Sequence, residues 1–87
     1  MAAKEDIRAQ VIQIIGEELS HDPDKITDQT TIMGDLGADS LDITELMLKF
    51  EDKFDIEIPE EEAQNIQSVG DAVRYLTQMV ESRSAKK

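Results

Sequence analysis

Apolar residues recur at helical spacing over the first part of the chain. One side of this segment collects Ile7, Val11, Ile14, Ile15 and Leu19. That stripe predicts a helix from about Lys4 to Leu19. The next segment, SHDPDKITDQTT, is rich in turn formers and predicts a long loop. We expect four apolar residues to pin this loop to the core, namely Ile26, Ile32, Met33 and Leu36.

Helical spacing returns in the middle of the chain, where a second helix is predicted from Asp39 or Ser40 to near Phe54. Gly37 can supply a positive φ in the turn before it. At about 100° per residue, one side of this helix is apolar and should face the core; it holds Ile43, Leu46, Met47, Phe50 and Phe54. The opposite side is acidic but carries two leucines; its members are Leu41, Thr44, Glu45, Leu48, Glu51 and Asp52.

The last third of the chain predicts a connection, a short helix and a long helix. The segment DIEIP alternates like a strand, but a lone strand has no partner here, so we interpret it as a connection. Pro59 followed by EEEAQNI predicts a short helix with acids in its first turn. Ser68 and Asp71 come close to a capping box, and a narrow apolar stripe follows with Val69, Val73, Leu76 and Val80.

These elements predict an all-α fold class, a small four-helix bundle made of three longer helices and one short helix. A long loop joins the first two helices. The chain has 87 residues, which fits a single domain over 1–87. Within it we expect an ordered bundle over about residues 4–80 and a frayed polar tail at 82–87.

Charge is concentrated in the middle of the chain. The net charge is −11, and residues 35–62 hold 11 of the 20 acidic residues but 2 of the 9 basic ones. This balance argues against a nucleic-acid binder, which needs a basic surface. Anionic lipid would repel the chain for the same reason. Basic protein surfaces are therefore the expected partners.

Composition also bears on where the protein works. No stretch approaches the roughly 20 apolar residues that span a bilayer, so we expect no membrane insertion. The start of the chain, MAAKEDIRAQ, lacks the apolar run of a secretory signal. The chain has no cysteine, which excludes a disulfide framework and thiolate metal sites and fits a reducing compartment. We expect a cytoplasmic monomer.

The stretch GADSLD places a serine at the start of the acidic helix. Asp39 can cap this helix by accepting a hydrogen bond from the backbone N–H of Leu41 or Asp42. The hydroxyl of Ser40 then lies at the positive end of the helix dipole, where a phosphate ester is favoured. On these residues alone, a serine that merely starts a helix is the simpler interpretation.

A longer stretch of the sequence favours a functional role for Ser40 over that simpler interpretation. DLGADSLDITELMLKFEDKFDIEIPEEEA resembles the central segment of the acyl carrier proteins of type II fatty acid synthesis. The GADSLD motif, the acidic helix behind it and the continuation F-x-I-x-I-P-x-E-x-A all match this family. The first helix and the SVGDAVRYL segment also fit, so the resemblance covers about residues 4–80.

The resemblance implies a carrier protein rather than an enzyme with its own active site. Ser40 would receive a 4′-phosphopantetheine arm from coenzyme A through a phosphodiester, in a reaction of a phosphopantetheinyl transferase (holo-acyl carrier protein synthase). The thiol of the arm would carry growing fatty acyl chains as thioesters, and the bundle core would open to hold them. Fatty acid synthesis enzymes and acyltransferases would bind the acidic helix through basic patches.

The resemblance also implies roles for the neighbours of Ser40. Asp39 and Leu41 flank the attachment serine. The partner-binding residues that it implies are Asp42, Thr44, Glu45, Leu48, Glu51 and Asp52, with weaker candidates in Asp35, Glu60 and Glu61. Thr44 and Lys49 depart from the family's usual side chains, which bears on partner choice. Phe50 is bulkier than the usual leucine, which bears on the acyl cavity.

Other functions compete with this one. A calcium loop could draw on Asp22, Asp24 and Asp28. An EF-hand, however, needs Gly and Glu where this chain has Thr27 and Met33, so we expect no metal site. A catalytic triad needs spatial convergence, which His21 and its sequence neighbours do not supply. A plain acidic interaction module and a carrier of aminoacyl or polyketide intermediates stay open, although the acidity and the GADSLD core favour fatty acid synthesis over peptide synthesis.

Overall fold

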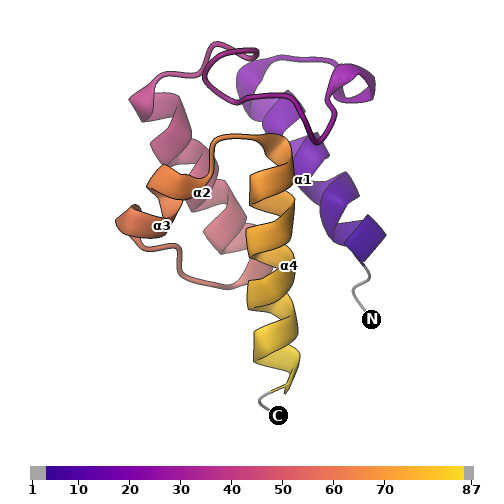
Figure 1. Ribbon diagram of the computed structural model, residues 1–87, viewed down its shortest axis with the longest axis vertical. Helices are drawn as coiled ribbons and strands as arrows, with labels where there is room; N and C mark the ends of the chain where they lie inside the picture. Colours follow the sequence, from indigo (N-terminus) through magenta and orange to yellow (C-terminus); the bar gives the residue numbers. More distant parts are fainter. Residues whose placement is uncertain (1–3, 86–87) are drawn as a thin grey trace.

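The computed structural model describes the backbone of residues 4–85 and the side chains of residues 7–82. Along the chain the helices are α1 (Lys4–Leu19), α2 (Ser40–Phe54), α3 (Glu60–Asn65) and α4 (Val69–Ala85), as Figure 1 shows. One 3-10 turn, η1 (Pro23–Lys25), lies in the loop between α1 and α2. Residues 4–85 contain no strand, and their β-type pairing is an isolated bridge between Thr31 and Ser68. The predicted all-α four-helix fold with its long first loop is confirmed.

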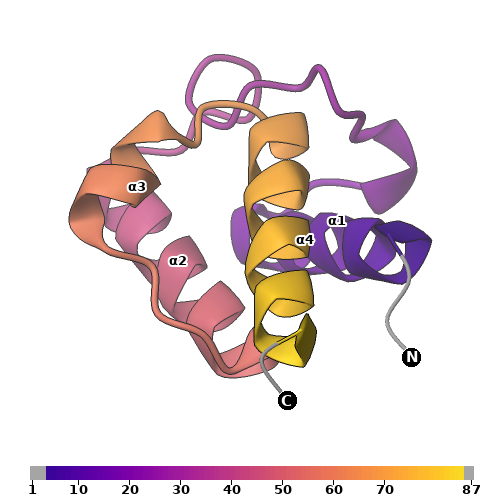
Figure 2. The same ribbon diagram turned by 60° about the horizontal axis from the view of Figure 1, so that its bottom comes forward.

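The three long helices surround one core that is almost entirely aliphatic. Helix α1 packs against both α2 and α4, and Figures 1 and 2 show the short helix α3 beside α2. The largest fully buried side chains come from these long helices and from the first loop; they are Ile7, Val11, Ile15, Ile32, Leu46, Phe50, Val69 and Leu76. Burial of these apolar surfaces is the main force that holds the helices together.

The apolar side of α2 faces this core, as its periodicity predicts. Leu46, Met47 and Phe50 are buried, and Phe50 is fully enclosed. Ile43 and Phe54 are half-buried and pack against the same cluster. Because these side chains fix the rotation of α2 about its axis, the opposite side of the helix is left to solvent.

Two of the four apolar residues expected to pin the first loop are buried in the core. Ile26 and Ile32 are 5% and 0% exposed, and Leu36 is half-buried against the cluster. The prediction is wrong for Met33, whose side chain is 60% exposed. The chain turns tightly here, since the amide of Gly37 donates to the carbonyl of Met33 at 3.1 Å. Neighbouring residues in such a turn cannot all face the same side of the chain.

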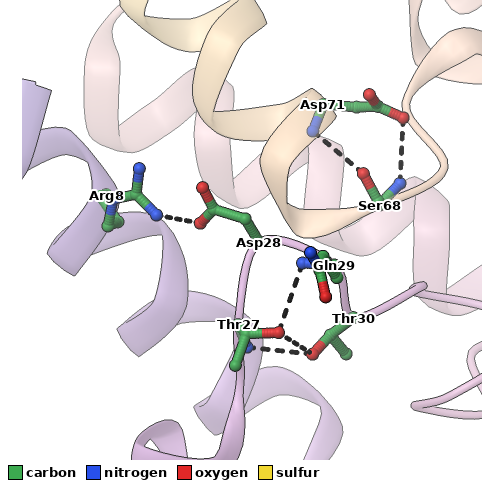
Figure 3. Close-up of polar contacts among 7 residues, drawn as sticks. All are labelled: Arg8, Thr27, Asp28, Gln29, Thr30, Ser68 and Asp71. Carbon is green, nitrogen blue, oxygen red and sulfur yellow. Dashed lines mark hydrogen bonds and ion pairs between the residues drawn. The ribbon is translucent and has the colours of Figure 1, made fainter.

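Polar contacts tie the same loop to α1 and α4 (Figure 3). Asp28 forms an ion pair with Arg8 of α1. The backbone carbonyl of Asp28 accepts a hydrogen bond from the amide of Gly70 at 2.9 Å. The amide of Val69 donates to the carbonyl of Thr30, also at 2.9 Å. The loop is therefore held against the start of α4 by its backbone, which gives a long connection a defined course.

Helix α4 begins with the predicted capping box (Figure 3). The hydroxyl of Ser68 accepts a hydrogen bond from the amide of Asp71 at 3.1 Å, and the carboxylate of Asp71 accepts one from the amide of Ser68 at 3.2 Å. The amide of Gln67 donates to the same carboxylate, and Arg74 forms an ion pair with it. Burial raises the pKa of Asp71, but these hydrogen bonds and the Arg74 charge outweigh it, so the pKa lies below its usual value.

The C-terminal helix is longer than the sequence predicts. We expected the ordered bundle to end near residue 80 and a frayed tail to cover 82–87. Helix α4 instead continues through Ala85, and residues 86 and 87 lie outside the described part of the chain. The segment ESRSA holds no proline or glycine that would end a helix, which is the physical reason that the helix can continue.

The lowered pKa of Asp71 predicts that acid weakens the fold at this cap. A carboxyl with a depressed folded-state pKa stabilises the protein above its unfolded pKa of about 3.9, and this contribution disappears as the pH falls through the folded-state pKa. We expect Asp71→Asn to melt below wild type at neutral pH, and the gap in Tm to close as the pH falls below the unfolded-state pKa of about 3.9. Circular dichroism melts at stepped pH measure this gap.

The control for this experiment is Asp24→Asn, which removes a carboxylate at an exposed position in η1. It should give a small gap in Tm that changes little over the same pH range. A gap for Asp71→Asn that stays constant from neutral pH to acid would contradict the role of the Asp71 carboxylate.

Candidate functional site

Ser40 is the first residue of α2 and is exposed to solvent. The residue before it, Asp39, caps the helix: its side chain accepts a hydrogen bond from the amide of Asp42 at 2.9 Å. This confirms the predicted capping by Asp39. The carboxylate of Asp42 also reaches back and accepts a hydrogen bond from the amide of Asp39 at 3.2 Å, which completes a capping box. Ser40 is thus held between two residues that bind each other.

The sequence prediction missed the return hydrogen bond from Asp39 to Asp42. The capping box is usually recognised by Glu or Gln at the third helical position, and this chain has Asp there. The signal that would have found it is the D-x-x-D spacing at a helix start. Since Asp42 is half-buried and engaged in the cap, its carboxylate has a structural role in addition to the partner-binding role implied by the family.

The turn before the helix places Ser40 at one end of the bundle. Gly37 adopts a φ of 72°, in the left-handed region that favours glycine. Ala38 is buried, with 5% of its surface exposed, and anchors the turn to the core. Asp35 and Thr31 close the same turn, since the amide of each donates to the side chain of the other at 2.9 Å. The attachment candidate therefore sits on a rigid support rather than on a free loop.

The structure places most of the predicted partner-binding residues on the solvent side of α2. Leu41 and Leu48 are 72% and 57% exposed, a large exposure for apolar side chains. Thr44, Glu45 and Asp52 are also exposed. Acidic and apolar side chains thus occur together beside Ser40, on a helix face that no other described element covers.

Two of the predicted partner-binding residues have intramolecular contacts. Glu51 is half-buried, and its carboxylate accepts a hydrogen bond from the amide of Ile58 at 2.7 Å. This bond fastens the α2–α3 connection to α2. The hydroxyl of Thr44 donates to the carbonyl of Ser40 at 3.0 Å. Neither bond is visible in the sequence, because both depend on the packing or rotamers of the folded chain.

A cleft of about 800 Å³ opens next to Ser40. Its apolar lining comes from α2, α3 and the segments on either side of α3, with Ile43, Met47, Leu48, Ile58, Ala63 and Ile66. Met33 of the first loop lies at the same cleft, which gives this exposed side chain an apolar neighbourhood. Phe50 does not line the cleft and is fully buried in the core. A serine beside an apolar cleft suits a tethered group with a hydrophobic end.

The residues of the competing sites have other surroundings in the part of the chain that the structure describes. Within the described side chains, no group of three or more His, Asp and Glu residues comes together in a way that could hold a metal ion. Two acids of the proposed calcium loop have other contacts: Asp22 caps η1 by accepting from the amide of Asp24, and Asp28 binds Arg8. His21 is an exposed loop residue.

Burial, with the nearby charges of Glu62 and Glu51, raises the pKa of Tyr75, so its hydroxyl stays protonated near neutral pH.

The chain matches a family defined by an attachment site for a prosthetic group. The family described as "Phosphopantetheine attachment site" matches residues 9–76, a range that includes Ser40 and all of α2. This match defines a carrier protein of the phosphopantetheine-binding class. In the part of the chain that the structure describes, no helix is both long and apolar enough to cross a membrane.

Curated relatives and a solved structure narrow the class. The chain is 51% identical over 73 residues to an acyl carrier protein of Caulobacter vibrioides, covering 84% of this chain and 94% of the relative. It is 49% identical over 71 residues to one of Phenylobacterium zucineum, covering 82% and 90%. The solved structure of an acyl carrier protein from Enterococcus faecalis superposes with a TM-score of 0.78 at 37% identity, covering 90% of this chain and 99% of that one.

The chain therefore belongs to the acyl carrier protein family. It is a carrier in fatty acid synthesis rather than an enzyme, and its cofactor is covalently bound 4′-phosphopantetheine. Its role brings it into contact with fatty acid synthesis enzymes and acyl chains. The resemblance read from the sequence is confirmed at the level of family, fold and carrier function.

The capping box at Ser40 predicts a measurable loss of stability for Asp39→Ala. The substitution removes the acceptor for the Asp42 amide, and loss of an N-cap costs about 1 kcal/mol of unfolding free energy. Asp39→Asn keeps a side-chain oxygen at the same place and should cost less. Urea unfolding followed by circular dichroism measures both variants. Equal unfolding free energies for Asp39→Ala and wild type would show that the cap does not stabilise α2.

Proposed function

We propose that Ser40 is the attachment site of the 4′-phosphopantetheine arm. The observation that carries this proposal is an exposed serine hydroxyl at the first position of a 15-residue helix, inside the range that matches the family. The partial positive charge at the helix start favours the phosphodiester that would form there. Asp39 supports attachment by fixing the helix start, and Leu41 supports it as an exposed apolar contact beside the serine.

The loading reaction would be carried out by a phosphopantetheinyl transferase, the holo-acyl carrier protein synthase. The Ser40 oxygen would form a bond to the phosphorus that bears the pantetheine group of coenzyme A. The pyrophosphate bond of coenzyme A would break, the serine proton would be lost, and adenosine 3′,5′-bisphosphate would leave. The chain has no cysteine, so the arm would supply the thiol that carries fatty acyl groups as thioesters.

The cleft beside Ser40 is the proposed site that shelters the acyl chain. Its lining includes Ile43, Met47 and Ile66, which would meet an alkyl chain with apolar surface. Burial of apolar surface from both sides favours this arrangement by about 25 cal/mol per Å². A reactive thioester near the cleft mouth would remain within reach of partner enzymes when the chain is withdrawn.

The solvent side of α2 is the proposed docking face. Glu45 and Asp52 supply exposed negative charge, while Leu41 and Leu48 supply exposed apolar surface. Acids of this kind accelerate and orient encounter with a basic patch, and apolar anchors contribute affinity after contact. The remaining partner-binding candidates, Asp42, Thr44 and Glu51, would act at the borders of this face. The expected partners are the transferase, fatty acid synthesis enzymes and acyltransferases.

We further propose that residues 1–87 form one acyl-carrier domain that works as a monomer in the cytoplasm. The family match spans residues 9–76 and supports a single domain. The net charge of −11 opposes self-association and supports the monomer. The lack of cysteine supports a reducing compartment.

Ser40→Ala is expected to keep the fold and to abolish loading. The apo-protein is incubated with coenzyme A, Mg²⁺ and holo-acyl carrier protein synthase, and intact mass is measured. Wild type should gain the mass of one phosphopantetheine group, whereas Ser40→Ala should gain none. Ser68→Ala is the control at another helix start, and it should load like wild type. Loading of Ser40→Ala would assign the arm to another residue, and an unmodified wild type would favour an acidic interaction module.

Glu45→Lys is expected to weaken docking to a basic partner without changing helix content. Reversal of an exposed charge on the docking face should lower kcat/KM for loading by about tenfold at low salt, and by less when salt screens the charges. Glu81→Lys makes the same change of charge at an exposed site on α4 and is the matched control. An equal loss for both variants would attribute the effect to net charge instead of the α2 face.

A further inference from the structure

The exposed side of α2 carries charges of both signs, and they are not mixed at random. Glu45 and Asp52 lie within about 20° of each other around the helix. Lys49 lies about 40° further round than Glu45, and Lys53 about 40° further again. All four side chains are exposed. The helix therefore carries two exposed acids and, next to them, two exposed lysines. Asp42 lies at a similar angle to the lysines, but it is at the helix start, half-buried, and its carboxylate is bonded to the amide of Asp39 in the cap.

One ion pair shows on which side the two lysines lie. Nζ of Lys49 lies 3.8 Å from a carboxylate oxygen of Glu18 in α1. The two lysines therefore border α1. On the other side of the two acids, Thr44 and Leu48 line the cleft that α2 shares with α3. A line across the face from α3 to α1 thus meets the cleft first, then the acids, and finally the lysines.

We propose that Lys49 and Lys53 form a basic border of the docking face that orients partner enzymes by pairing with an acidic group beside the partner's basic patch. This inference rests on the proposed function of the α2 face and deepens it. The occupant of the border is thus an acidic side chain of an enzyme whose basic residues meet Glu45 and Asp52. The border selects among basic partners, because a partner with basic residues alone would place like charges against the lysines.

Two signs of charge orient a partner better than one. A uniformly acidic face attracts a basic patch in any rotation about the axis between the two proteins. With the lysine border present, a partner rotated by half a turn would set its basic group against Lys49 and its acidic group against Glu45. Juxtaposed like charges disfavour that orientation. The correct rotation matters here because the arm on Ser40 must enter the partner's active site.

The ion pair with Glu18 does not occupy Lys49 fully. The side chain of Lys49 remains 62% exposed, and the Nζ–oxygen distance of 3.8 Å is long for a hydrogen bond. Exposed pairs of this kind contribute little to stability. Glu18 is 20% exposed and restrains the lysine on the α1 side. The lysine is therefore positioned before contact but keeps donors for a partner carboxylate.

Charge reversal at Lys49 tests the border, because steering by net charge and the basic border predict opposite changes in kcat/KM for loading. Lys49→Glu and Lys25→Glu change the net charge equally; Lys25 is exposed in η1, which Figures 1 and 2 show on the far side of α1 from α2. The probe is holo-acyl carrier protein synthase with coenzyme A, and kcat/KM is measured at low salt. Steering by net charge predicts that both variants load as fast as wild type or faster. The border predicts that kcat/KM falls about threefold or more for Lys49→Glu and does not fall for Lys25→Glu.

Three further variants separate docking from structure. Lys49→Gln avoids a new repulsion with Glu18. It should lower kcat/KM, but by less than Lys49→Glu does. Lys53→Glu should also lower kcat/KM, although Lys53 has no ion pair with the described side chains of α1. Glu18→Gln breaks the pair but keeps the lysine, so it should load like wild type. Circular dichroism melts confirm that each variant is folded.

The outcomes distinguish the inference from the proposed function beneath it. Loss of loading in Lys49→Glu and Lys53→Glu, with Glu18→Gln and Lys25→Glu near wild type, supports the border. Loading of Lys49→Glu that equals or exceeds that of Lys25→Glu overturns the border and leaves the carrier function intact. An equal loss for Glu18→Gln overturns it too, because the ion pair would then be the cause. A wild-type protein that accepts no arm overturns both.

Discussion

Burial of Phe50 and Leu46 in the core is the constraint on which the rest of the molecule depends. Both side chains are fully buried, and they fix the rotation of α2 about its axis. A rotation by half a turn would expose them and would bury acids of the opposite face, at a large cost in solvation. The core therefore decides which residues of α2 are exposed to solvent and available to a partner. The proposed docking face, the cleft and the proposed lysine border all depend on this packing.

The cap at Ser40 fixes where the helix starts, as the core fixes its rotation. The side chains of Asp39 and Asp42 each accept a hydrogen bond from the other's backbone amide. This fixes the position of Ser40 along the axis of α2. The acids of this region are divided between two tasks. Asp42 and Glu51 bind backbone amides and are half-buried, whereas Glu45 and Asp52 stay exposed. Hydrogen bonds from backbone amides compensate part of the cost of burying the carboxylates of Asp42 and Glu51.

The cleft depends on contacts between segments far apart in sequence. Helices α2 and α3 both line the cleft, and the connection between them is fastened to Glu51 through the amide of Ile58. The first loop reaches the same region because its backbone binds the start of α4, with Val69 bonded to Thr30. Ile43 of α2 and Ile66 after α3 then line one cavity next to Ser40. A small core leaves little redundancy, so these few polar bonds have a large share in positioning the cleft.

The sequence by itself determined the helices, the core side of α2 and the location of the exposed serine. These follow from local rules: apolar spacing sets the buried stripe, and short-range side chains set the caps at Asp39 and Ser68. The tertiary structure alone decided the contacts of Glu51 and Lys49. Each depends on a partner 7 to 31 positions away, such as the amide of Ile58 for Glu51 and the carboxylate of Glu18 for Lys49. Periodicity describes one helix at a time, whereas these contacts exist only after the helices pack.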